Sequence, residues 1–148
     1  MLTINTASIF YKMPHLIIEY SSNLAAKLEV QTLVDRVHTA ALETGMFKIG
    51  AVRTRATARD FYRIADGHPD NGFIHLVLRI AQGRETQAKR RAGEAIFDAI
   101  CDELQTLFET TPLGISFEIQ EIEQSLSFKK NNLHELVQRR TETLKESS

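Results

Sequence analysis

Apolar residues recur along this chain with two spacings that alternate. Short runs rich in branched and aromatic residues are typical of strands, whereas two longer stretches repeat their apolar residues every three or four positions, as one helix face does. Strands are expected over residues 15–20, 51–57, 73–80 and 115–122. Helices are expected over residues 30–44 and from 86 to about 110, with a shorter one within 131–138 before a polar, frayed tail.

The order of these elements is strand, helix, strand, and then the same again. Right-handed crossovers place both helices of two such units on the same side of the sheet. The sequence therefore predicts an α+β fold in which tandem β-α-β units form a four-stranded sheet with two helices on one face. We expect the other face to be bare and rich in apolar residues. An oligomer would then cover it by packing sheet against sheet or around a common axis.

The second expected strand carries two arginines on one of its faces. Val52 and Thr54 alternate with Arg53 and Arg55, and side chains two apart in a strand point the same way. The ordinary interpretation of such a pair is the solvated face of an edge strand. The polar loop over residues 66–72 is interpreted as a connection, because it lacks the ligand spacing and closing glutamate of a calcium loop.

Length, charge and cysteine content narrow the class of protein. The 148 residues suit one domain, and 18 basic against 19 acidic residues give a net charge of −1. Neither nucleic acid nor an anionic membrane is expected as a partner. No run is long and apolar enough to span a membrane, residues 1–12 lack the pattern of a signal peptide, and Cys101 is alone. We therefore expect a cytoplasmic protein with Cys101 as a small core residue.

A proline directly before the first strand is the strongest candidate for chemistry. If translation starts at Met13 and this methionine is removed, Pro14 has a free secondary amine. Burial and nearby cations would lower the pKa of that amine toward neutrality, where a general base works best. If residues 1–12 are retained, the same nitrogen is an amide without useful basicity. The alternative is structural, because proline is common at the first position of a strand.

Other catalytic signatures are missing from the sequence. It has no glycine-rich phosphate loop, no paired cysteines of the C-x-x-C type and no G-x-S-x-G motif. Its five histidines lack metal-ligand spacing, so neither a metal nor a cofactor is expected, and His75 is interpreted as a hydrogen-bonded core or interface residue. Arg53, Arg55 and Arg84 remain, and separated guanidinium groups suit a substrate with two carboxylates.

Several stretches together resemble the 5-carboxymethyl-2-hydroxymuconate Δ-isomerase family of the tautomerase superfamily. They fall in the family's order from Pro14 to about Leu136. They are PHLIIEYS at 14–21, GMF at 45–47, VRTR at 52–55, ADG at 65–67, FIH at 73–75, GR at 83–84, SFEI at 116–119 and FKKNNLH at 128–134.

This resemblance implies a homotrimer with active sites between neighbouring subunits, and a cofactor-free isomerase of homoprotocatechuate degradation. The substrate would be a small unsaturated hydroxy or oxo diacid, and 5-carboxymethyl-2-hydroxymuconate would become its conjugated 2-oxo isomer. By position, Pro14 matches the family's catalytic proline. Arg53 and Arg84 match its substrate-binding arginines, and Arg55 would have a secondary role.

The chain departs from the family at its N-terminus, because thirteen residues precede Pro14. We interpret residues 1–13 as an extension or a mis-assigned start, 14–136 as the isomerase domain and 137–148 as a polar tail. Two hypotheses follow. Either the protein is an isomerase with a free Pro14 amine, or it is a tautomerase-fold protein for binding or assembly whose blocked proline does no catalysis.

Overall fold

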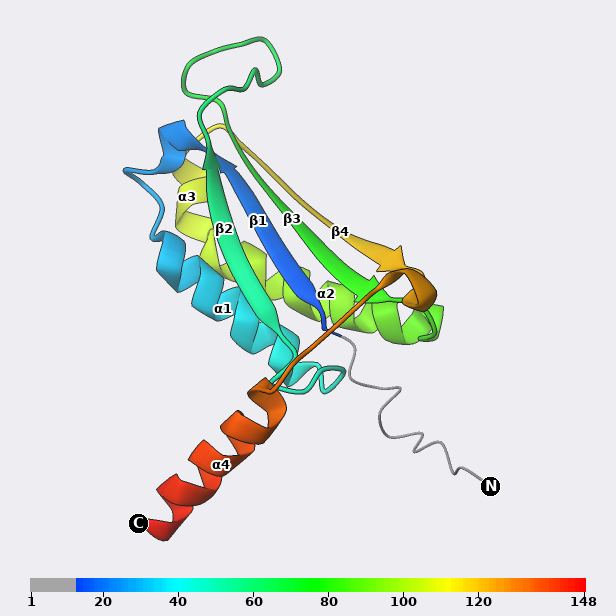
Figure 1. The fold of residues 1–148 in the computed structure, drawn as a ribbon. Helices are drawn as coiled ribbons and strands as arrows, with labels where there is room; N and C mark the ends of the chain where they lie inside the picture. Colours follow the sequence, from blue (N-terminus) through cyan, green and yellow to red (C-terminus); the bar gives the residue numbers. More distant parts are fainter. Residues whose placement is uncertain (1–12) are drawn as a thin grey trace.

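A four-stranded mixed sheet is the centre of the fold. The computed structural model describes residues 13–148, so expectations for residues 1–12 lie outside it. The strands are β1 (His15–Ser21), β2 (Arg53–Arg59), β3 (Gly72–Ala81) and β4 (Leu113–Ile122), in the order β2-β1-β3-β4 (Figure 1). β1 pairs in parallel with β2, as does β3 with β4, and β1 is antiparallel to β3.

Two long helices cover one face of this sheet, as the sequence predicts. These are α1 (Val30–Glu43) and α2 (Thr86–Glu103), which lie side by side behind the strands in Figure 1. Gly45 follows α1 with a φ of +73°, a left-handed conformation that glycine adopts without a Cβ clash and that commonly ends helices. The predicted tandem β-α-β architecture is therefore confirmed.

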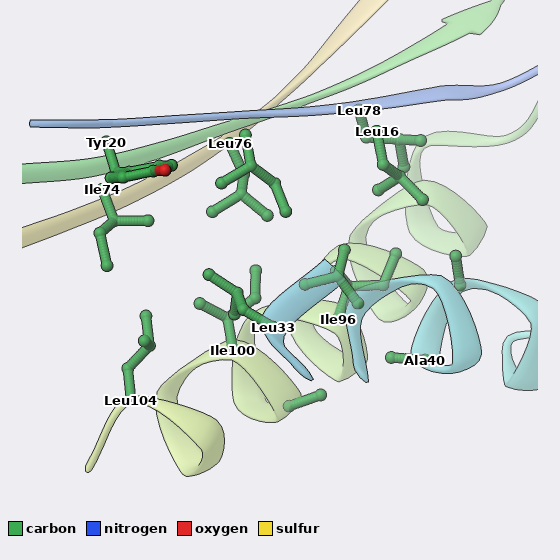
Figure 2. Packing of buried hydrophobic residues seen from close by; sticks show 14 of the residues in the cluster. Leu16, Tyr20, Leu33, Ala40, Ile74, Leu76, Leu78, Ile96, Ile100 and Leu104 are labelled. Atoms are coloured by element: carbon green, nitrogen blue, oxygen red, sulfur yellow. The ribbon is translucent and has the colours of Figure 1, made fainter. Parts of the chain in front are cut away.

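The core lies between the sheet and these two helices. Every second residue of β1 and β3 points toward the helices and is buried, as period-two alternation requires. Figure 2 shows these strand side chains above those of α1 and α2: Leu16, Tyr20, Ile74, Leu76 and Leu78 face Leu33, Ala40, Ile96 and Ile100. Burial of this apolar surface holds both helices against the sheet.

The open face of the sheet is polar, and our expectation of an apolar bare face is wrong. Most apolar residues of the strands alternate toward the helices, which leaves mainly polar side chains on the other side, with Ile17, Phe73 and Val77 lying among them. An ion pair from Arg59 to Glu19 at 2.8 Å and a hydrogen-bond contact of 3.0 Å between His75 and Glu118 cross between neighbouring strands there.

Two helical predictions need correction. Instead of one helix to about residue 110, the chain has α2 and then α3 (Gln105–Thr110), separated at Leu104, whose φ of −96° and ψ of 6° leave the helical region. The last helix, α4 (Leu133–Glu146), is longer than the expected short helix and includes most of the tail. Three- and four-residue spacing predicts helical faces, but it does not reveal a single nonhelical residue within them.

Strand directions bring several connections to one end of the sheet. Because β1 and β2 are parallel, both start at this end, while β3, antiparallel to β1, ends there, and so does β4. Residues 123–132 then cross from the end of β4 past the start of β1 to α4 (Figure 1). Pro14, Arg53 and Arg84 all lie near this end.

Candidate active site

Pro14 lies at the start of β1 and is buried. Its carbonyl accepts a hydrogen bond of 3.2 Å from the backbone N–H of Arg53, which fixes the start of β2 beside it. The guanidinium of Arg53 donates to the carbonyl of Ala51 at 2.7 Å. The sheet register thus holds a basic side chain next to the proline.

Arg84 follows β3 in the turn before α2, and its side chain is half-buried. The guanidinium carbon lies 5.1 Å from the ring centroid of Phe47, a cation–π arrangement, and Nη2 donates to the carbonyl of Met46 at 3.4 Å. Nη1 is buried and has no hydrogen-bond partner within residues 13–148. Burial also lowers the pKa of Arg84 from its ordinary value.

A recess of about 190 Å³ opens at the same end, on the open face of the sheet. His15 and Arg55 form part of its wall, with His15 Nδ1 3.0 Å from a guanidinium nitrogen of Arg55. The recess is lined by Met13, His15, Arg55, Arg79, Ala81, Ile122, Ser127, Phe128 and Lys129. It therefore borders on the residue that precedes Pro14.

Lys129 connects this recess electrostatically to Arg84. Partial burial lowers the pKa of the Lys129 ammonium, and the positive charge of Arg84 lowers it further. The pKa of His15 is lowered first by burial and then by four cations, which are Arg55, Arg53, Arg79 and Lys129. The end of the sheet around Pro14 is thus strongly positive although the whole chain is nearly neutral.

The structure brings the predicted residues to one end but divides them. Pro14 and Arg53 are joined by a backbone hydrogen bond. Arg84 packs on Phe47 away from the open face of the sheet, whereas Arg55 lines the recess on that open face. Sequence reasoning did not select His15, Arg79 or Lys129.

A signal for the first two residues was available in the strand pattern. In period-two alternation, His15 and Arg79 occupy the face opposite the buried residues, and the register makes them direct neighbours. Lys129 belongs to the FKKNNLH stretch, but no pattern places that connection across the sheet end.

His75 agrees with its interpretation as a hydrogen-bonded residue, whereas Cys101 does not belong to the buried core, contrary to expectation. His75 lies within hydrogen-bonding distance of Ser116 at 2.7 Å and of Glu118 at 3.0 Å. Cys101 is half-buried, and its pKa is raised by burial and then by Asp98 and Asp102, which favours the thiol.

Within residues 13–148, no three histidine, cysteine or acidic side chains are grouped as metal ligands. No helix in that range has the length and apolar character to cross a bilayer.

Comparisons with known proteins agree on one family. The family model described as 5-carboxymethyl-2-hydroxymuconate isomerase matches residues 14–137. The 5-carboxymethyl-2-hydroxymuconate Delta-isomerase of Escherichia coli is 36% identical over 124 residues, which are 84% of this chain and 98% of that protein.

Two solved structures extend this likeness to the fold. A 5-carboxymethyl-2-hydroxymuconate isomerase from Deinococcus radiodurans R1 is 33% identical with a TM-score of 0.80, covering 86% of this chain and 96% of that one. A second structure, of a 5-carboxymethyl-2-hydroxymuconate delta-isomerase, is 32% identical with a TM-score of 0.81, covering 88% and 96% respectively. The chain is therefore an isomerase that belongs to the 5-carboxymethyl-2-hydroxymuconate isomerase family.

Proposed function

We propose that this isomerase converts 5-carboxymethyl-2-hydroxymuconate to its conjugated 2-oxo isomer in the degradation of homoprotocatechuate. The reaction moves one proton and shifts double bonds, with no net oxidation and no cofactor. The names of the relatives and the positive end of the sheet support this substrate, since a muconate carries two carboxylates and the carboxymethyl group a third. The proposed substrate is thus a tricarboxylate, with one carboxylate more than the expected diacid.

Pro14 is the proposed general base, acting through a free secondary amine after Met13 is removed. The amine takes the proton of the 2-hydroxyl group and returns it to the distal carbon, so the amine is regenerated. The burial of Pro14 and the cations around it would both disfavour a charged amine and lower its pKa. The start of the family match at residue 14 supports Met13 as the functional start.

The unpartnered Nη1 of Arg84 is the observation that carries the proposal. A buried guanidinium donor without an acceptor costs free energy, on the order of 1–3 kcal/mol, which an incoming carboxylate or oxyanion would offset. Arg84 and Arg53 would hold substrate carboxylates and stabilise the negative charge that develops on the 2-oxygen. A preformed donor does this with little reorganisation during the reaction.

The first test compares two purified forms of the protein, one beginning at Pro14 and one at Met1, each verified by intact mass. Isomerisation of the dienol is followed by the absorbance of the conjugated product. We expect turnover only from the form with a free Pro14 amine. Equal turnover by both forms would exclude this amine as the base.

A Pro14→Ala variant separates the base from the rest of the site. In the form that begins at residue 14, this change replaces the ring amine with a primary amine, and we expect kcat to fall by about 10²-fold or more, the usual contribution of a positioned acid or base. An unchanged kcat would favour a protein in which Pro14 is only structural. Circular dichroism of the variant is the control for folding.

We also propose that the protein is a cytoplasmic homotrimer whose active sites lie between neighbouring subunits. The trimer is what the resemblance to the family implies, and a single cysteine is compatible with a reducing compartment. Residues 14–136 would form the isomerase domain, with 1–13 before it and a polar tail over 137–148.

A further inference from the structure

We propose that the recess lined by His15, Arg55, Arg79 and Lys129 is an anion subsite that binds the third carboxylate of the substrate. Its assignment to the substrate rests on the proposed function, whereas its binding of a carboxylate does not. Hereafter it is called the basic recess.

The side chains that line the basic recess carry only positive charges. Of the nine side chains around the basic recess, Arg55, Arg79 and Lys129 are basic and none is acidic. Within residues 13–148 these three cations form no ion pair with a carboxylate, although an ion pair crosses the same sheet face further along. Cations gathered in a recess repel one another, and an anion between them relieves this repulsion.

The hydrogen bond between Arg55 and His15 supplies a directed donor. A guanidinium can only donate, so Nδ1 of His15 is the acceptor and the ring is neutral, with its proton on Nε2. The lowered pKa of His15 agrees with a neutral ring at neutral pH. His15 therefore offers the Nε2–H group as a donor, while Arg55 is held in place by Nδ1.

The position of the basic recess relative to Pro14 fits one substrate molecule. Met13 lines the recess, so its removal would open the recess toward the Pro14 nitrogen. Arg84 lies on the other side of the sheet end, beside Phe47. A volume of about 190 Å³ accommodates a carboxymethyl group, which has four heavy atoms, together with water at about 30 Å³ per molecule.

This arrangement makes the basic recess a determinant of specificity. Arg53 and Arg84 are the proposed partners of the carboxylates in the muconate chain, and the recess would bind the one on the carboxymethyl branch. Charge-assisted hydrogen bonds from arginine are strong and directional, so an analogue without the branch loses them. We expect dicarboxylates to bind more weakly than tricarboxylates.

The test is a binding titration of the form that begins at Pro14, the proposed functional form, and it needs no turnover. Tricarballylate, a tricarboxylate, and glutarate, a dicarboxylate, are each titrated while NMR follows the His15 ring signals, assigned with a His15→Asn variant. Tricarballylate should shift these signals and bind at least about tenfold more tightly than glutarate, which is about 1.4 kcal/mol. Arg79→Gln and Lys129→Gln should each remove most of this difference.

Lys130→Gln is the matched control, because it removes the same charge one residue away from Lys129, outside the lining of the basic recess. It should leave tricarballylate affinity within about twofold. Equal losses in Lys129→Gln and Lys130→Gln, or His15 signals that do not move at saturation, would overturn the inference. Lys129 lies in a connection outside the sheet, so its variant remains informative if Arg79→Gln fails to fold.

Failure of this inference is distinguishable from failure of the proposed function. A protein that isomerises the dienol while Arg79→Gln binds tricarballylate like the wild type retains the function and loses the subsite. A protein that binds tricarballylate through the basic recess but turns over no dienol retains the subsite and loses the proposed substrate.

Discussion

Arg84 shows how a single residue can serve ligand binding at a cost to folding. Its guanidinium is half-buried with one nitrogen unpartnered among the described residues, and it packs on Phe47. Desolvation of the unpartnered donor opposes folding, whereas the aromatic contact favours it. Both effects are on the order of 1 kcal/mol, so they nearly cancel in the empty protein.

We therefore expect Arg84→Ala to separate binding from stability. Loss of a charged hydrogen-bond donor should weaken binding of the dicarboxylate glutarate by about 1.5–3 kcal/mol, while the free energy of unfolding changes by less than about 1 kcal/mol. Calorimetric titration and urea unfolding give the two values. Arg90→Ala, at an exposed position of α2, is the charge-matched control and should change neither. Unaltered glutarate affinity in Arg84→Ala would contradict the role of Arg84.

His15 makes stability depend on pH in a known direction. Its pKa is lowered in the folded protein from the ordinary 6.5, chiefly by burial and then by Arg55, so the unfolded chain binds more protons below that pH. The stability that neutral His15 contributes to the folded protein is complete above about pH 6.5. It is lost as the pH falls toward the pKa of His15 in the folded protein.

His15→Asn tests this sign, because the amide oxygen can still accept from Arg55 but does not titrate. Urea unfolding at about pH 7.5 and about pH 5 should show a smaller loss of stability in the variant than in the wild type on acidification. A loss of equal size in both proteins would assign the pH dependence to other groups.

At this scale the sequence indicates candidate residues, whose roles stay predictions, but not their contacts. Pro14, Arg53 and Arg84 followed from the resemblance, and all three lie near the same end of the sheet. Lys129 could not be predicted, since its position depends on the path of a connection without regular structure. Arg55 is exposed, as its surface interpretation predicts, but alternation shows only the face of a strand and not the recess that Arg55 lines.

The exposure of the apolar helix face changes at the break between α2 and α3. Ile100 is fully buried, whereas Phe108, which three- and four-residue spacing places on the same apolar face, is 58% exposed. Leu104, where the backbone leaves the helical region, is itself buried in the core.

We expect substitutions on either side of this break to have unequal effects. Ile100→Ala should lower the free energy of unfolding by about 2–5 kcal/mol, because it leaves a cavity in a packed core. Phe108→Ala should lower it by less than about 1 kcal/mol, since most of its surface is already in water. Urea unfolding of both variants decides this, and similar losses would mean that one continuous helical face is buried.

Elements with strong periodicity were predictable, and their irregularities were not. The four strands and α1 agree with the expected ranges to within a few residues because each buries one face against the same core. α2 begins where expected but ends at Glu103 rather than near residue 110. The polarity of the open face was misjudged since the apolar residues of the strands were counted together. Separating odd from even positions assigns most of them to the helix side.

On the scale of the whole molecule, the polar open face bears on assembly. Charged and hydroxyl groups there do not favour a dry interface between two sheets, so we expect subunits to meet mainly at other surfaces. Other surfaces for assembly include the two edges of the sheet, because β2 and β4 each pair with a strand on one side only.

The expected trimer has a direct measurement. Light scattering coupled to size-exclusion chromatography should give a mass about three times the 16.8 kDa of the chain. The mass should persist at an ionic strength of about 1 M if the contacts are mainly apolar, because salt at that concentration screens exposed charges within about 3 Å. A monomer mass at all concentrations would contradict active sites shared between subunits.

The loop between β2 and β3 lies at the opposite end of the sheet from Pro14 (Figure 1). Phe61 in this loop is 98% exposed. This end is therefore a natural attachment point for a fluorophore or a solid support, introduced through Phe61→Cys. A label there would leave the basic end of the sheet unobstructed, so the immobilised protein could be supplied with substrate and rinsed repeatedly while its chemistry is observed.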